Sequence, residues 1–199
     1  MISGQNHVSK LCPEVLNIPG QSSPKVKHFL NNLLEIENVS YLEIGVWAGS
    51  TFISAMYKNK PIQSISIDNF SQKYDGVYGR DLFLYFCDKF LDKKYYNFIE
   101  SDSFKIDVSQ IKIPINIYFY DGDHSVEGQE KALTYYDEIL DDIFIYIVDD
   151  YNFPEVVEGT KNGIEKMKYH IDYETILPAR FNGDSSNWWN GLYVSVLRK

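Results

Sequence analysis

The feature that most constrains the fold of this chain is the stretch of residues 41–56. An apolar run over residues 41–44 leads into a turn that contains Gly45 and Gly49, and apolar residues then recur at helical spacing from Ser50 onward. The two glycines allow a sharp turn and let a ligand lie against the main chain, while the N–H groups at a helix start favour an electron-rich group. The stretch therefore predicts a strand, a glycine loop and a helix, which is how many nucleotide-binding α/β folds begin.

Glu43 decides which kind of ligand suits this loop. A dinucleotide fingerprint places glycine at that position so that pyrophosphate can approach, whereas a carboxylate would repel pyrophosphate. A carboxylate instead suits a ligand whose near end carries an ammonium and a sulfonium, which describes S-adenosylmethionine (SAM). A nicotinamide-dependent dehydrogenase is disfavoured for the same reason.

The same stretch resembles motif I of the class I SAM-dependent methyltransferases, whose acidic-x-Gly-x-x-x-Gly form is matched by Glu43, Gly45 and Gly49. The resemblance implies that SAM is the cofactor and that these residues contact it together with Trp47 and Ser50. The alternative is a strand-to-helix turn that needs two glycines only for packing.

Length and charge limit the other possibilities. The 199 residues suit one domain with a real core, and 19 basic against 28 acidic residues give a net charge of −9. This charge argues against a nucleic-acid partner or an anionic membrane surface and favours a small-molecule acceptor, with a homo-oligomer left open. Cys12 and Cys87 have no metal-like spacing and residues 1–10 contain no apolar run, so we expect reduced thiols in a cytoplasmic protein.

The pattern along the chain predicts one α/β domain over residues 23–199, preceded by a polar arm over residues 1–22. Ser23 and Pro24 are expected to begin an amphipathic helix, and Ser125 can cap the helix that follows the strand over residues 115–120. Strands are expected over residues 41–44, 61–68, 95–100, 115–120, 143–148, 173–177 and 192–197. The expected fold is a doubly wound, Rossmann-like sheet of seven strands, mostly parallel with an antiparallel last strand, as in the methyltransferases that motif I resembles.

Two acidic residues follow strands that should neighbour the glycine loop. Asp68 ends the second strand about 20 residues past the turn, where an acid can accept hydrogen bonds from two ribose hydroxyls. The alternative is a turn aspartate that caps Asn69 and Phe70. Asp102 follows the third strand, and the resemblance implies that it contacts the adenine amine, with a solvated turn as the alternative.

A second group of carboxylates is expected where two further strands end. Asp121 and Asp123 follow the strand over residues 115–120, and Asp149 and Asp150 follow a continuous apolar run. The carboxyl ends of parallel strands share one edge of a sheet, and like charges gathered there repel unless a cation offsets them. Carboxylate oxygens suit Mg²⁺ or a similar divalent cation. Capping of loops and helix starts without a metal is the alternative.

Residues 121–128, Asp-Gly-Asp-His-Ser-Val-Glu-Gly, resemble the small methyltransferases of the macrocin O-methyltransferase type and the cephalosporin hydroxylase-like proteins, which share the Asp-Gly-Asp-His arrangement. The resemblance implies that Asp121, Asp149 and Asp150 are metal ligands and that Asp121 also contacts the cofactor. It further implies that Asp123 is the general base. His124 is a competing base because its charge changes near neutral pH.

Together these features predict a SAM-dependent O-methyltransferase that acts on a small hydroxylated acceptor, sugar-like or phenolic, with help from a divalent metal. The chain departs from the catechol-type pattern, which has a lysine base just beyond its Asp-His pair, where this chain has Ser125 and Val126. Two other functions remain open at this point: a metal-dependent hydroxylase-like enzyme on the same fold, and a non-catalytic SAM-binding module.

Overall fold

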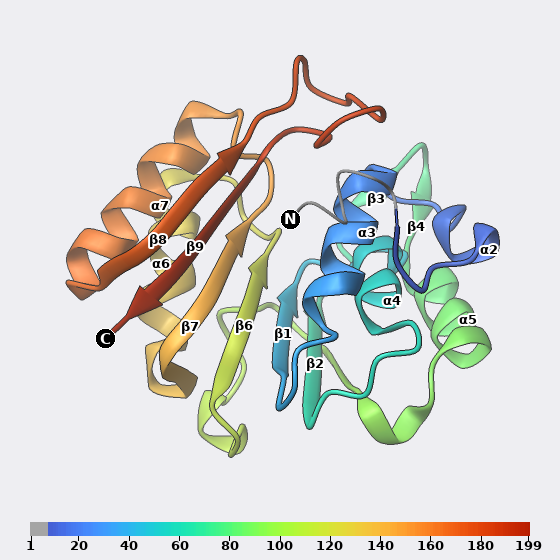
Figure 1. Ribbon diagram of the computed structural model, residues 1–199, viewed down its shortest axis with the longest axis horizontal. Helices are drawn as coiled ribbons and strands as arrows, with labels where there is room; N and C mark the ends of the chain where they lie inside the picture. Colours follow the sequence, from blue (N-terminus) through green and yellow to red (C-terminus); the bar gives the residue numbers. More distant parts are fainter. Residues whose placement is uncertain (1–7) are drawn as a thin grey trace.

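A central sheet organises the computed structural model, which describes residues 8–199 (Figure 1). The strands are β1 (Ser40–Ile44), β2 (Gln63–Asp68), β3 (Lys73–Tyr74), β4 (Val77–Tyr78), β5 (Asn97–Glu100), β6 (Ile115–Tyr120), β7 (Leu140–Val148), β8 (His170–Leu177) and β9 (Leu192–Arg198). The seven-stranded sheet has the order β5-β2-β1-β6-β7-β9-β8, and β3 and β4 form a separate hairpin. Pairing is parallel except at β9, which runs antiparallel to both β7 and β8. The predicted seven-stranded, mostly parallel α/β sheet is confirmed.

Helices cover both faces of the sheet. The α-helices are α2 (Pro13–Leu16), α3 (Pro24–Leu33), α4 (Ser50–Met56), α5 (Arg80–Phe90), α6 (Val126–Tyr136) and α7 (Pro154–Met167). Short 3-10 helices are η1 (Lys93–Tyr95), η2 (Val108–Gln110) and η3 (Asp137–Ile139). In Figure 1, α3, α4 and α5 gather to one side of the sheet, and α6 packs with α7 on the other.

Alternate side chains of the central strands face two separate cores. Tyr41 and Phe119 belong to the core beneath α3 and α4, whereas Leu42 and Tyr118 belong to the core beneath α6 and α7. Every residue of β1 is buried, as expected for a central parallel strand that is covered on both faces. Because side chains alternate along a strand, Glu43 shares the face of Tyr41 and is directed toward α4.

The helix starts follow the predicted signals. The Val26 amide donates to Ser23 Oγ at the start of α3, and Pro24 occupies the first helical position. At α6 the Gly128 amide donates to Ser125 Oγ at 3.0 Å. This second cap fixes the path of residues 121–125, which carry the Asp-Gly-Asp-His run from β6 into the helix.

The described part of the predicted arm, residues 8–22, is packed against α3 and α4 by main-chain and side-chain contacts. Val15 and Ile18 are buried in the same core as these helices. Residues 1–7 of the predicted arm lie outside the described residues, and the boundary at residue 22 stays a prediction. None of the helices found between residues 8 and 199 is long and apolar enough to cross a bilayer.

Candidate functional site

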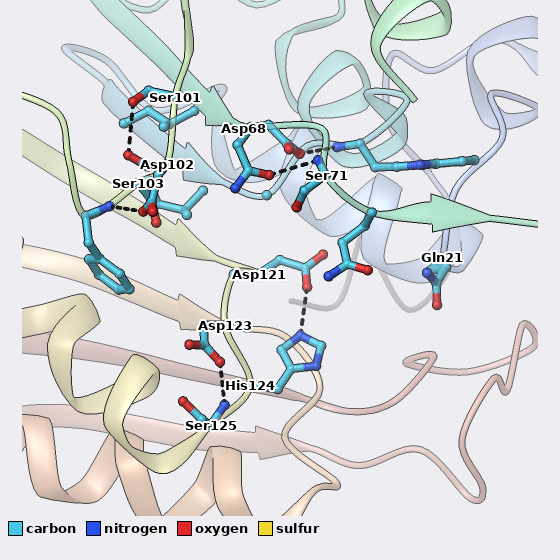
Figure 2. A pocket seen from close by; sticks show the side chains of 18 of the residues that line it. Gln21, Asp68, Ser71, Ser101, Asp102, Ser103, Asp121, Asp123, His124 and Ser125 are labelled. Atoms are coloured by element: carbon cyan, nitrogen blue, oxygen red, sulfur yellow. Dashed lines mark hydrogen bonds and ion pairs between the residues drawn. The ribbon is translucent and has the colours of Figure 1, made fainter. Parts of the chain in front are cut away.

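A cavity of about 680 Å³ opens at the carboxyl ends of β1, β2, β5 and β6 (Figure 2). This is the edge of an open parallel sheet at which ligands bind. The volume lies within the usual range for small-molecule sites. The predicted site residues that line it are Gly45, Trp47, Asp68, Asp102, Asp121, Asp123 and His124.

Gly45 permits the ends of the neighbouring strands β1 and β6 to lie against each other. It has a φ of +81°, and a Cβ at this position would lie 1.8 Å from the main-chain oxygen of Asp121. The Gly45 amide donates to the Ile67 carbonyl and the Asp121 amide donates to the Ile44 carbonyl, both at 2.9 Å. Any side chain at Gly45 would force these loops apart, so the glycine is required by close approach as well as by its backbone conformation.

Asp68 ties the end of β2 to the glycine loop. Its Oδ2 accepts hydrogen bonds from the Val46 and Trp47 amides at 2.8 Å each, and its Oδ1 accepts one from the Phe70 amide at 2.6 Å. The expected capping turn is therefore present, and Asp68 also faces the cavity. A carboxylate has about four lone-pair positions that can accept hydrogen bonds. Three are taken by these amides, so roughly one position remains for a ligand hydroxyl.

Asp102 lies in the turn after β5, on the cavity wall. The Phe104 amide donates to its Oδ1, and Lys105 Nζ lies 3.0 Å from its Oδ2. The backbone hydrogen bond and the ammonium lower the pKa of Asp102 below its usual value. Asp102 is therefore an ionised hydrogen-bond acceptor on the cavity wall, and it also stabilises the turn of residues 102–104 by accepting from the Phe104 amide.

Glu43 lies beneath the glycine loop, and the structure does not place it among the described residues of the cavity wall. It has no exposed surface, and its two oxygens accept hydrogen bonds from Tyr41 Oη and Thr51 Oγ1 at 2.5 Å each. Burial raises the pKa of Glu43 to about 8, so the carboxyl is largely neutral at pH 7. Glu43 ties β1 to α4 under the loop, and a direct contact between a Glu43 charge and the cofactor does not follow from this position.

Gly49 and Ser50 also lie behind the part of the cavity wall that residues 8–199 form. Gly49 has a φ of +84°, and a Cβ there would lie 2.6 Å from the Ile53 side chain. Ser50 is buried, and its hydroxyl has no hydrogen-bond partner among the described residues. Trp47 does line the cavity, and its ring meets Tyr74 of the β3-β4 hairpin edge to face at 5.6 Å. The hairpin thus closes over the loop.

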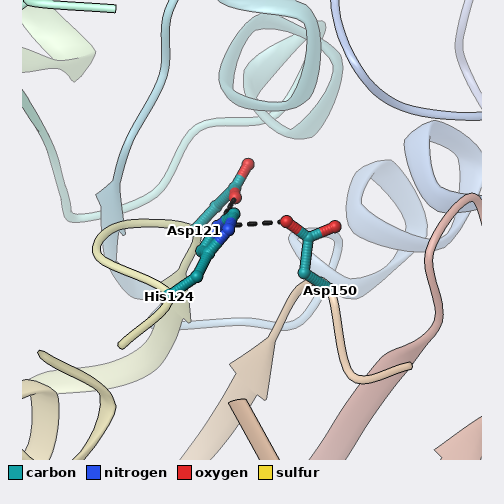
Figure 3. A group of neighbouring side chains, drawn as sticks. All are labelled: Asp121, His124 and Asp150. Atoms are coloured by element: carbon teal, nitrogen blue, oxygen red, sulfur yellow. Dashed lines mark ion pairs between the residues drawn. The ribbon is translucent and has the colours of Figure 1, made fainter. Parts of the chain in front are cut away.

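Asp121, His124 and Asp150 bring three potential ligand atoms together beside the cavity (Figure 3). His124 Nε2 lies 3.0 Å from Asp150 Oδ2 and 3.6 Å from Asp121 Oδ1, and the three ligand atoms lie within 4.8 Å of one another. Ligand atoms roughly 2.1 Å from one small divalent ion would lie about 3–4 Å apart, so small side-chain movements suffice to hold one. Burial is the main cause, and the charge of Asp150 the second, of a pKa of Asp121 well above its usual value. A bound cation would remove that penalty.

Asp149 is not part of this group in the portion of the chain that the structure describes. It is buried, and its Oδ1 accepts a hydrogen bond from the Asp150 amide at 2.9 Å. Burial and the Asp121 charge raise the pKa of Asp149 well above its usual value. Asp150 has a φ of +60°, and only this second aspartate turns toward His124. The described geometry therefore groups His124, rather than Asp149, with Asp121 and Asp150, and the role of Asp149 as a metal ligand stays a prediction.

Asn190 is a site residue that the sequence analysis missed. Its Nδ2 donates to Asp150 Oδ1 at 2.6 Å, which fixes the carboxylate whose other oxygen faces His124. Asn190 comes from the loop between β8 and β9, and its main-chain oxygen accepts a hydrogen bond from the Asn152 amide. The Asn190-Gly191 pair is typical of a tight turn, but nothing in the sequence joins that turn to Asp150.

Asp123 lies on the cavity wall next to His124. The Ser125 amide donates to its Oδ1 at 2.9 Å, and Gln129 Nε2 donates to its main-chain oxygen. Gly128 packs against it so closely that a Cβ there would lie 2.6 Å from Asp123 Cγ. The carboxylate is thus held in one orientation, and no hydrogen-bond donor of the described chain occupies Oδ2.

The sequence matches no protein-family model and no curated protein. Solved structures nevertheless share its fold. TomG, an O-methyltransferase of Streptomyces achromogenes that is involved in tomaymycin synthesis and was solved with SAM, is 13% identical, with a TM-score of 0.67 over 100% of this chain and 95% of that chain. An O-methyltransferase from Bacillus cereus, solved with S-adenosylhomocysteine (SAH), is 16% identical, with a TM-score of 0.62 over 98% and 91%.

A longer protein, a candidate SAM-dependent methyltransferase from Streptococcus mutans, is 18% identical with a TM-score of 0.61. The match covers 88% of this chain but only 48% of the Streptococcus mutans chain, so this chain spans about half the length of that protein. The two O-methyltransferases are matched over nearly their whole length, so the likeness extends over the entire sheet of this chain. The chain therefore has the class I fold found in SAM-dependent methyltransferases of known structure.

Proposed function

We propose that this chain transfers the methyl group of SAM to a hydroxyl of a small acceptor, with a divalent cation beside the acceptor. The observation that carries the proposal is the position of the cavity: it lies at the carboxyl edge of a methyltransferase-type sheet and borders both Asp68 and the group formed by Asp121, His124 and Asp150. Cofactor and acceptor can meet there, which is the main requirement for in-line transfer.

The cofactor is assigned to the part of the cavity between the glycine loop and the end of β5. Asp68 retains about one acceptor position for a ribose hydroxyl, and Asp102 can accept from an exocyclic amine. Trp47 closes this part under the β3-β4 hairpin. The assignment of SAM to this part of the cavity rests on the hydrogen-bond acceptors of Asp68 and Asp102 in its wall and on a volume that suits a small molecule.

Asp123 is assigned as the general base. Asp123 lines the cavity, the Ser125 amide holds its Oδ1, and no described donor occupies Oδ2, so a turn of this side chain toward the cavity would let Oδ2 take the proton of an acceptor hydroxyl. The acceptor oxygen then forms a bond to the methyl carbon as the carbon–sulfur bond breaks, which leaves a methyl ether and SAH. His124 is less suited to this role because its Nε2 already faces two carboxylates.

Asp121, His124 and Asp150 fit a divalent cation by the chemistry of their donors, which are two carboxylates and one imidazole. Such a cation, when bound, would lower the pKa of an acceptor hydroxyl and offset the gathered negative charge. The imidazole favours a first-row transition ion such as Mn²⁺ over Mg²⁺, because Mg²⁺ prefers an all-oxygen shell. Asn190 keeps Asp150 oriented for this role.

The test is formation of SAH in the presence of polyhydroxylated and phenolic acceptors, with wild type, Asp123→Asn and a control variant, Glu127→Gln. Glu127 is exposed in the first turn of α6 and does not belong to the described cavity wall, so its variant should match wild type. Asp123→Asn should lower turnover by about 10²–10⁴-fold while SAH binding is retained. Tight SAH binding with no turnover on any acceptor would instead support a binding module.

Metal dependence needs a separate arm of the same assay. Exhaustive chelation should lower turnover, and Mn²⁺ should restore it at a lower concentration than Mg²⁺. Undiminished turnover after chelation would refute the role of the metal but leave methyl transfer intact. Oxygen consumption without SAH formation would point to the hydroxylase-like alternative.

A further inference from the structure

The segment of residues 8–22 is anchored to α3 and α4 by buried polar groups. The Lys10 amide donates to Asn31 Oδ1 at 3.0 Å, and Lys10 Nζ donates to Asn59 Oδ1 at 2.7 Å. Asn59 in turn donates to the main-chain oxygens of Asn31 and Ala55. Since buried polar contacts of this kind are geometrically demanding, the segment has one defined path across the helices.

Lys27 on α3 provides the next anchor. Its side chain is 4% exposed, and its ammonium donates to the main-chain oxygens of Leu16 at 2.8 Å and Ile18 at 3.1 Å. No carboxylate in the described part of the chain pairs with it. A buried ammonium is costly, and here only carbonyls at the end of α2 offset the cost. Its evident consequence is to hold the chain at Leu16 and Ile18.

The segment that follows reaches the cavity directly. Gly20 lies against Ser50, the first residue of α4, so closely that a Cβ on Gly20 would be 2.3 Å from Ser50 Cβ. Gln21, the next residue, lines the cavity, and Figure 2 shows it on the side away from Asp102. The hydroxyls of Ser22 and Ser50 are buried with no partner among the described residues. Neither serine belongs to the described cavity wall, so a buried water rather than the cavity ligand would complete these two hydroxyls.

We propose that Gln21 binds the amino-acid end of the cofactor and that Lys27 is the positioning residue that holds Gln21 in place. This inference rests on the proposed function, because it assumes SAM in the cavity. With adenosine toward Asp68 and Asp102, the methionine part extends toward the opposite side, where Gln21 lies. The Gln21 amide can donate to a carboxylate and accept from an ammonium, so it suits both charged groups of an amino acid.

The experiment is calorimetric titration of SAH and of adenosine into wild type, Gln21→Ala, Lys27→Met and a control, Lys60→Met. SAH carries the amino-acid end and adenosine lacks it. Gln21→Ala should weaken SAH binding about tenfold, the effect of one hydrogen bond to a charged group, and leave adenosine binding unchanged. Lys27→Met should give the same selective loss, and faster amide exchange over residues 16–22. Lys60 is exposed, and its variant should match wild type.

The outcomes separate this inference from the proposed function. If wild type binds neither SAH nor adenosine, the proposed function fails. If wild type binds SAH and Gln21→Ala binds it equally well, the inference fails alone. An equal loss of SAH and adenosine binding in either variant also overturns it, because that pattern reports general damage to the site. If Lys27→Met does not fold, Lys27 is purely structural and the positioning role is refuted, while the exposed Gln21 still tests the contact.

Discussion

Replacing Glu43 by glutamine tests the inference that burial keeps this acid neutral. The folded-state pKa is about 8 against an ordinary value of 4.5, so the unfolded chain releases this proton at a lower pH than the folded chain. Because the folded pKa is raised, the stability contribution is complete below pH 4.5 and is lost as the pH rises toward 8. Each pH unit in this window costs about 1.4 kcal/mol, and the whole shift corresponds to roughly 5 kcal/mol.

Glutamine has nearly the same shape as a protonated glutamate and does not titrate. The hydroxyls of Tyr41 and Thr51 can accept as well as donate, so both contacts of Glu43 can persist in the variant. The free energy of unfolding of Glu43→Gln, minus that of wild type, should therefore rise by about 3 kcal/mol between pH 4.5 and 7 and level off above pH 8.

The measurement is urea unfolding of both proteins at several pH values, with Glu37→Gln as a control at an exposed glutamate. The control should show no such difference. A stability difference between Glu43→Gln and wild type that does not change from pH 5 to 8 would refute the reasoning, because it would mean that Glu43 is ionised in the folded state. SAH affinity of Glu43→Gln should stay within about threefold of wild type, whereas a charge that selects the cofactor would make the loss at least tenfold.

Three further predictions concern the loops around the cavity. Gly45→Ala should lower the free energy of unfolding by roughly 2–5 kcal/mol, from left-handed backbone strain and collision with Asp121, and an unchanged urea midpoint would contradict this. Asn190→Ala should weaken Mn²⁺ binding about tenfold by releasing Asp150, as measured by calorimetry, with equal affinity counting against the role of Asn190. His124→Ala should weaken Mn²⁺ binding by more than Asn190→Ala, and the reverse order would argue against His124 as a ligand.

The sheet could be predicted well because its strands carry strong local signals. Buried parallel strands are nearly continuous apolar runs, and β6 and β7 lie where such runs occur in the sequence. Helices α3 and α6 begin at the expected serines because an N-cap is a local hydrogen bond, independent of distant residues. The number of strands and the antiparallel last strand came from the resemblance, and the structure confirms both.

The side-chain directions at the site could not be predicted in the same way. All residues of β1 are buried, so no polar alternation indicates which face Glu43 occupies. Asp149 and Asp150 are adjacent in sequence, and only the positive φ of Asp150 decides which of them meets His124. The direction of the Glu43 side chain and the choice between Asp149 and Asp150 depend on tertiary packing against both faces of the sheet. A local sequence pattern does not encode that packing.

Long-range contacts account for the remaining gaps. Asn190 reaches Asp150 only because β9 pairs with β7 in the antiparallel register that joins Val148 and Tyr193. Gln21 lies on the cavity wall, and Lys27 holds the chain shortly before it at Leu16 and Ile18, within a segment that looks like a polar arm in the sequence. Asn190 and Asp150 are 40 residues apart, and Lys27 meets main-chain oxygens 11 and 9 residues before it; neither contact has a local sequence signal.

The central claim is that the cavity at the carboxyl edge of the sheet binds SAM. Calorimetric titration of SAH into the purified chain tests it most directly, with NADH as the competing ligand class. One SAH should bind per chain, and NADH should produce no binding heat. A folded chain that binds NADH, or that shows no response to millimolar SAH with or without Mn²⁺, would contradict the account.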